Sequence, residues 1–199
     1  MILVIDSSSP SRAAIAALDD ETNGGTSGET NGETTRELFT PRFDLESARR
    51  LVRARRVTKV AVATGPGSFT GLRAGVSFGL GVAVGLGVPI AALPSLDIQA
   101  HRSVEPATAV VEAGRGRYYY RAPGGRPALG EPADIPTRHP LVGFVGRPDS
   151  LVAAGHRFVR EDMLRSFTEA ALRTLESARE VPYRNLEIEY MQSFSPRKV

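Results

Sequence analysis

The chain has 199 residues, a formal net charge of +3 at pH 7, 41% hydrophobic residues and 24% charged residues. This balance is typical of a folded, soluble chain that buries one good core or two small ones, and the modest charge does not by itself indicate a nucleic-acid binder. The absence of cysteine excludes disulfides and thiolate metal sites. We expect no bilayer-spanning run and no signal peptide, because Met1 opens directly into an apolar segment, and therefore a cytoplasmic location.

The first predicted elements are two buried strands joined by a short polar turn. Residues 2–5 form a continuous apolar run, and residues 13–18 form a second one. Asp6, Ser7 and Ser8 follow the first run. Asp and Ser side chains commonly satisfy the backbone of a tight turn, which is the favoured interpretation of this group.

A polar segment and a basic helix are predicted next. Residues 19–35 repeat Glu-Thr-Asn-Gly motifs with five acids and no base, and they predict a mobile hairpin loop without a function of its own. Residues 44–56 predict an amphipathic helix with Asp44 as its N-cap. The arginines of this helix are Arg49, Arg50, Arg53, Arg55 and Arg56. A solvated face, an acidic partner surface and tRNA phosphates all stay open as interpretations of them.

A glycine-rich helix is the most unusual predicted element. The strand expected over residues 57–63 leads into Gly-Pro-Gly-Ser-Phe-Thr-Gly-Leu-Arg and then a helix over residues 68–85. Its glycines recur every four residues, at Gly67, Gly71, Gly75 and Gly79. Residues four apart share one helix face, so the stripe predicts close packing, either on a partner or on the chain's own sheet.

The same loop does not match the common phosphate-binding patterns. A P-loop ends in Gly-Lys-Ser/Thr, but Gly71 is followed by Leu72. The Rossmann pattern fails as well, because the glycine spacing is one residue too long and no acid stands about 20 residues further on. Metal binding is not expected either, since His101, His139 and His156 are too far apart for a helical two-histidine motif.

The remaining elements complete an α/β pattern. They are a strand over 88–93, a helix over 95–102, a hairpin of 107–112 with 117–121, a strand over 141–145 and a helix over 161–179. Strands that alternate with helices predict a layered fold with parallel crossovers. Tyr118 and Tyr120 share one strand face, where core packing is a commoner role than base stacking.

Several of these motifs together resemble one family. Met-Ile-Leu-Val-Ile-Asp-Ser-Ser at residues 1–8, the Gly-Pro-Gly-Ser-Phe-Thr-Gly-Leu-Arg string, Gly-Val-Pro-Ile at 87–90 and Pro-Ser-Leu at 94–96 are similar to the bacterial TsaB family, formerly YeaZ. Residues 111–119 resemble the family's Asp-Ala-Arg-x-Gly-Glu-Val-Tyr hairpin, with Glu112 and Arg117 in place of its acids. From residue 122 onward little matches.

The resemblance implies an actin-like ATPase (RNase H-like) fold with a complete N-terminal lobe, residues 1–102, and a reduced C-terminal lobe, residues 103–199. In that superfamily the first hairpin holds an Asp-x-Gly-Thr phosphate loop. Asp6, Ser7 and Ser8 lack its glycine, so backbone cannot approach a phosphate as easily, and a vestigial loop is expected.

The resemblance also implies a function through partners. TsaB proteins are the non-catalytic partner of TsaD, the transferase that places threonylcarbamoyl on the tRNA adenosine next to the anticodon. We therefore expect a scaffold subunit that binds a TsaD-like transferase and a TsaE-like ATPase, forms a self-dimer when alone, meets tRNA indirectly and uses no cofactor, with ATP or ADP at the partner interface as the alternative. The expected interface residues are Gly67, Gly71, Leu72, Gly75, Gly79, Arg49 and Arg53.

Two enzyme classes compete with this interpretation. A nucleotide-binding module or ATPase of the actin and sugar-kinase superfamily is favoured by fold analogy alone, and the second half shows no acidic, glycine-rich phosphate loop. A metallopeptidase needs clustered ligands, which three dispersed histidines do not supply. No adjacent nucleophile, base and orienting acid mark covalent catalysis, so no catalytic residue is assigned.

Overall fold

A six-stranded mixed sheet forms the centre of the molecule. The computed structural model describes residues 1–18, 36–54 and 56–191. The sheet runs in the order β10-β5-β4-β1-β2-β3. Its strands are β1 (Ile2–Asp6), β2 (Ala13–Leu18), β3 (Arg36–Thr40), β4 (Lys59–Gly65), β5 (Ile90–Pro94) and β10 (Glu180–Val181). β1 pairs antiparallel with β2 and parallel with β4, so the predicted hairpin and crossover are both present.

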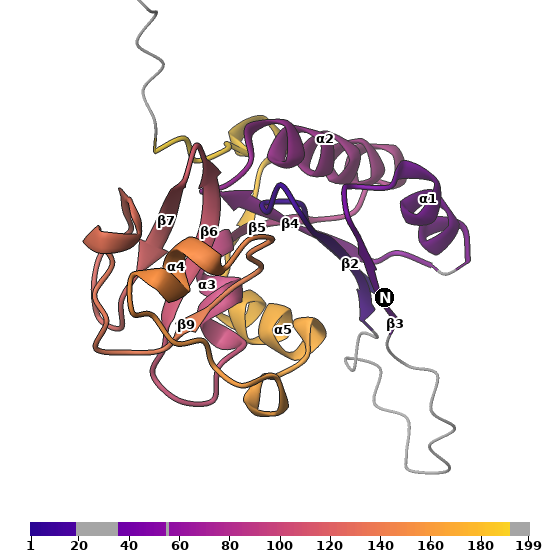
Figure 1. Cartoon of the computed structure of the whole chain (residues 1–199). Coiled ribbons are helices and arrows are strands. Elements are labelled where there is room, and N and C mark those ends of the chain that lie inside the picture. The colour runs from indigo at the N-terminus through magenta and orange to yellow at the C-terminus, as the bar shows by residue number, and fades with distance from the viewer. Residues whose placement is uncertain (19–35, 55, 192–199) are drawn as a thin grey trace, which may run out of the picture.

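Two helical layers cover this sheet because both of its faces are apolar (Figure 1). Alternation along β1 sends Leu3 and Ile5 to the face under α1 (Leu45–Ala54) and α2 (Phe69–Leu86). Ile2 and Val4 point to the opposite face, which packs on α3 (Ser95–His101) and α5 (Phe167–Ser177). A strand buried on both faces is expected from the continuous apolar run.

A second, four-stranded sheet lies beside α3 in the order β8-β7-β6-β9. Its strands are β6 (Thr108–Gly114), β7 (Arg117–Arg121), β8 (Ala128–Gly130) and β9 (Leu141–Val142). Leu96 of α3 packs with Ala109 and Val142 on one face. The other face packs on Leu151 of α4 (Asp149–Ala153), next to the 3-10 turn η1 (Pro132–Asp134). The structure is therefore an α/β fold with two sheets, as the sequence predicts.

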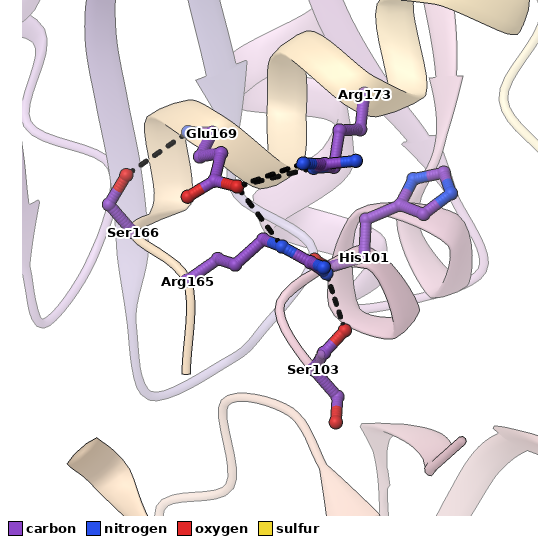
Figure 2. Close-up of polar contacts among 6 residues, drawn as sticks. All are labelled: His101, Ser103, Arg165, Ser166, Glu169 and Arg173. Atoms are coloured by element: carbon purple, nitrogen blue, oxygen red, sulfur yellow. Dashed lines mark hydrogen bonds and ion pairs between the residues drawn. The ribbon is translucent and has the colours of Figure 1, made fainter. Parts of the chain in front are cut away.

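A polar cluster fixes α5 against α3, as Figure 2 shows. Arg165 donates to the carbonyl oxygens of His101 and Ser103, at 3.0 and 2.6 Å. Its Nε also lies 3.0 Å from Glu169 Oε1, and the same carboxylate oxygen accepts from Arg173 at 3.2 Å. Charged donors on backbone carbonyls at the end of α3 satisfy groups that the helix leaves unpaired.

Local capping sets the helix boundaries, and strand pairing sets the strand boundaries. The predicted helix over 161–179 begins only at Phe167, because Ser166 accepts from the Glu169 N–H as its N-cap, while Glu161–Met163 form the 3-10 turn η2. The strand expected over 141–145 covers two residues, since only Leu141 and Val142 pair with β6. β3, β8, β10 and α4 were not predicted. The loop predicted over 19–35 lies outside the described residues.

The C-terminal part returns to the first sheet. β10 pairs antiparallel with β5, and Leu186 and Ile188, beyond the 3-10 turn η3 (Tyr183–Asn185), pack on the core under α2. The division into lobes at 1–102 and 103–199 stays a prediction.

α2 is long and apolar enough to cross a membrane by length and composition, so the expectation that no such run exists is wrong in that sense. Its 18-residue window has a mean hydropathy of 1.4 and is 28% buried inside the molecule. One face of the helix packs on β1 and β4, and the opposite face is exposed, which is the arrangement of a helix that covers one face of a sheet.

Candidate functional site

The β1–β2 turn packs directly against the start of α2. Ser7 Oγ donates to the Gly71 carbonyl at 2.8 Å, and the Ser68 N–H donates to the Ser8 carbonyl at 2.6 Å. Ser68 is also the N-cap of α2, because its Oγ accepts from the Gly71 N–H at 3.2 Å. The Ser68 N–H and the Ser8 carbonyl are therefore bonded to each other. A phosphate that used this N–H, or a metal that used this carbonyl, would have to compete with that bond.

The glycine stripe of α2 makes this close contact sterically feasible. A Cβ at Gly67 or Gly71 would overlap the carbonyl oxygens of Ser8 and Ser7, and a Cβ at Gly75 would overlap the Ser7 hydroxyl. At Gly79 it would overlap Val62 of β4 instead. The stripe therefore packs within the chain: Gly67, Gly71 and Gly75 lie against the β1–β2 turn, and Gly79 lies against the sheet.

This packing changes how the predicted interface residues are placed. Leu72 is fully buried, and Gly75 and Gly79 are buried as well. Their surface is occupied inside the chain, whereas Arg49 and Arg53 lie exposed on α1. The structure does not bring the two groups into one surface. Partner contact by any of these residues stays a prediction.

Asp6 is sequestered at the end of β1. Its side chain is 1% exposed, and its two oxygens accept from the Ser8 N–H at 2.9 Å and from Gln99 Nε2 at 3.2 Å. Burial raises the pKa of the Asp6 carboxyl, against the opposing effect of these hydrogen bonds. Among the described residues, Ser8 Oγ and Gln99 Oε1 are buried without a hydrogen-bond partner. The Asp6 carboxyl thus faces protein, and the expectation of a vestigial phosphate loop stays a prediction.

Glu112, at the β6–β7 hairpin, bridges the two sheets. Its carboxylate accepts from Ser11 Oγ at 3.2 Å and from the N–H groups of Gly146 and Arg147 at 2.9 and 3.3 Å. Ser11 belongs to the β1–β2 turn, so a carboxylate of the second sheet is bonded to the turn of the first. The sequence marked Glu112 as a departure from the resembled hairpin but gave no sign of this bridge.

An aromatic cluster borders a hollow at the start of α2. The Arg73 guanidinium stacks 3.7 Å from the centre of the Phe69 ring, and its Nε donates to Tyr190 OH at 3.1 Å. Phe69 and Tyr190 are 38% and 45% exposed. The adjacent hollow of about 290 Å³ is also lined by Glu112 and Tyr119.

The outer face of α2 consists of small and apolar exposed residues. They are Ala74, Ser77, Gly81, Val84 and Gly85. A Cβ at Gly81 or Gly85 would meet no atom within 4 Å. Ala74, Ser77, Gly81 and Gly85 lie three or four positions apart, the spacing of one helix face, and Val84 lies three positions after Gly81. That signal was available in the sequence beside the more regular glycine stripe.

The histidines have structural contacts. His101 Nδ1 lies 2.9 Å from Thr174 Oγ1, and His156 Nε2 lies 2.8 Å from the Pro132 carbonyl. Burial lowers the pKa of His101. Within the described parts of the chain, no group of three or more His, Cys, Asp or Glu residues is arranged to hold a metal ion.

One protein-family model matches this chain. The family model described as TsaD, tRNA N6-adenosine threonylcarbamoyltransferase, matches residues 39–139, which is half of the chain. The chain belongs to the TsaD family. The match runs from the end of β3 through α2 and strands β6, β7 and β8 to the region after η1, and so includes the glycine-striped helix and the Glu112 hairpin.

Solved structures show the fold of this TsaD family member. YeaZ from Pseudomonas aeruginosa superposes with a TM-score of 0.65 at 18% identity, over 96% of this chain and 99% of that one. A second structure, a protein from the same organism described as similar to peptidase YeaZ, gives 0.64 at 18% identity with the same coverage. No curated protein sequence matches significantly. The predicted likeness to TsaB, or YeaZ, and the predicted fold are confirmed.

Proposed function

We propose that this chain is a non-catalytic subunit that supports a TsaD-type transferase in placing threonylcarbamoyl on tRNA. Membership of the TsaD family supports involvement in this tRNA modification. The observation that favours a supporting role is the closed β1–β2 turn. Asp6 is buried and bonded to Ser8 and Gln99, and the turn is bonded to α2 and to Glu112.

The closure argues against a working phosphate site on physical grounds. A phosphate binds where backbone N–H groups point outward at a helix start or glycine-rich turn. Here the Ser68 N–H already donates to Ser8, and the N–H groups of Gly146 and Arg147 already donate to the Glu112 carboxylate. A nucleotide phosphate would have to break these bonds and approach the Glu112 carboxylate, which repels it.

We place the partner surface on the outer face of α2, defined by Ala74, Ser77, Gly81, Val84 and Gly85. Small residues let another helix approach closely, and Val84 at 54% exposure adds apolar area. Arg49 and Arg53 lie exposed on α1, and we keep them as candidate charged contacts of the same partner. In this proposal the partner is a TsaD-like transferase, with a TsaE-like ATPase in the same complex and a self-dimer in its absence. The proposed location is the cytoplasm, and tRNA contact is indirect.

A bulky residue on the outer face tests this proposal. Gly81→Leu should leave the monomer folded, because open space surrounds the position and Gly costs about 1 kcal/mol relative to Ala in a helix. It should weaken complex formation with the transferase of the same organism by at least about tenfold, since the side chain has no room at a close helix crossing. Size-exclusion chromatography and calorimetry measure binding, and a thermal melt reports folding.

Glu176→Leu, at an exposed position of α5, is the matched control, because it adds a leucine to a different helix surface. Unchanged binding by Gly81→Leu would remove α2 as the partner surface. A separate assay decides the supporting role. ATP turnover by the isolated chain that disappears in Asp6→Ala would instead establish the ATPase alternative.

A further inference from the structure

Two arginines converge on one aromatic ring between the sheets. Arg12, just before β2, lies with its guanidinium carbon 4.7 Å from the centre of the Phe144 ring, and Arg102, at the end of α3, lies at 4.4 Å. Arg12 also stacks 4.2 Å from the Phe39 ring. A guanidinium that stacks by its face keeps its in-plane N–H groups free for an acceptor.

These N–H groups have no acceptor inside the described chain. The Nε of Arg102 is buried and has no hydrogen-bond partner among residues 1–18, 36–54 and 56–191, and neither guanidinium forms an ion pair there. Burial, and after it the charge of Arg12, lowers the pKa of Arg102. Two like charges with free donors, close enough for one to lower the pKa of the other, form an arrangement that an anion stabilises.

A hollow of about 250 Å³ lies between the two side chains. Ser11, Gly143, Gly146 and Leu164 line it together with Arg12, Arg102 and Phe144. Sites for drug-sized ligands have volumes of about 300–1,000 Å³, so this hollow has room for a small group only. It is separate from the hollow beside Phe69 and Tyr190, which shares no lining residue with it.

We propose that Arg12 and Arg102 bind a small oxyanion, a phosphate or carboxylate group, in this hollow. The planar guanidinium group donates to either kind of oxyanion in the same bidentate geometry. Glu161 also lines the hollow, and its carboxylate opposes an anion there. The negative charges of Glu37 and Asp6 also act on Arg102, so acidic as well as basic groups surround the site.

Calorimetric titration with inorganic phosphate, at constant ionic strength kept with sodium chloride, tests the proposal. The wild-type chain should bind one phosphate saturably. Arg12→Gln and Arg102→Gln should each raise the Kd at least about tenfold, the effect of losing one charged hydrogen-bonding partner. Arg102→Lys should also weaken binding, because lysine keeps the charge but not the fork. Glu161→Gln should lower the Kd, because it removes a repelling charge.

Matched arms separate the sources of the oxyanion. Arg126→Gln removes an exposed arginine from the loop between β7 and β8 and should bind phosphate like wild type. Competition by AMP assigns the site to a nucleotide phosphate, and competition by acetate assigns it to a carboxylate. The proposal fails if phosphate does not saturate the wild type, or if Arg126→Gln weakens binding as much as Arg12→Gln. Arg12 is exposed, so we expect Arg12→Gln to fold, and it tests phosphate binding even if Arg102→Gln does not fold.

Discussion

Asp6 illustrates how burial limits what a single carboxyl group can bind. A carboxylate that serves a phosphate or metal must be ionised and accessible, whereas this one is enclosed by Ser8 and Gln99. Burial favours the protonated form and raises its pKa above the ordinary value of 3.8. The folded state therefore binds the proton more tightly than the unfolded state does, and stability falls as the pH rises from about 3.8 through the folded pKa.

Replacement of Asp6 by Asn tests this sign. Asp6→Asn should be more stable than wild type at pH 8, and the difference should shrink as the pH falls, because protonation of wild-type Asp6 removes the buried charge. The amide can keep the Ser8 hydrogen bond, and its N–H₂ can donate to Gln99 Oε1, which has no partner among the described residues. Urea unfolding at several pH values measures the difference. Lower stability of the variant at every pH would show that the ionised form is required.

At the scale of the element, α2 has two glycine-containing faces, and adding a side chain should have opposite effects on stability at the two. Gly75 lies against Ser7 and Ile5, whereas Gly81 has open space around it. The amino acid is the same at both positions, and only the neighbours differ. The period of four in the sequence identifies the inner stripe but contains no information on what lies opposite it.

Paired alanine substitutions measure this difference. Gly75→Ala should lower the free energy of unfolding by about 1–3 kcal/mol, because the new methyl group overlaps the Ser7 hydroxyl. Gly81→Ala should raise it by up to about 1 kcal/mol through helix propensity alone. Urea unfolding of the two variants and wild type provides the comparison. Equal effects at the two positions would contradict the packing of the inner stripe on β1.

At the scale of the whole molecule, the C-terminal segment runs beside α2 and ties it to the sheet. Tyr183 OH donates to the carbonyls of Ala83 and Val88, at 3.2 and 2.7 Å, and the Glu189 N–H donates to Thr64 at 2.8 Å. These contacts lie at opposite ends of α2. The segment therefore supports the same helix that carries the proposed partner surface.

Truncation after residue 181 should destabilise the chain. It removes Leu186 and Ile188, both partly buried on the α2 core, and the expected loss is on the order of 3 kcal/mol. At this chain length that corresponds to a melting temperature lower by roughly 10 °C. A truncation after residue 191 is the control, since it keeps every contact described above. Equal melting temperatures of the two would show that the segment contributes nothing to stability.

The sequence predicted the elements whose burial is continuous and local. β1, β2 and α2 follow from their own apolar runs and caps, and the turn at Asp6 follows from its residue types. β3, β8, β10 and α4 are short, and their formation depends on neighbours that are distant in sequence. The Glu112 bridge joins residues 101 positions apart in the chain, and the pair of Arg12 and Arg102 likewise comes together only in the fold. Periodicity contains no information on such contacts.

The bond between Glu112 and Ser11 also bears on how fast and how tightly a partner can associate. This bond joins the β6–β7 hairpin of the second sheet to the β1–β2 turn of the first, so we expect the surface on α2 to meet its partner as a rigid body. Association should then follow a single exponential with a rate constant of about 10⁵–10⁷ M⁻¹s⁻¹, without a slow conformational phase.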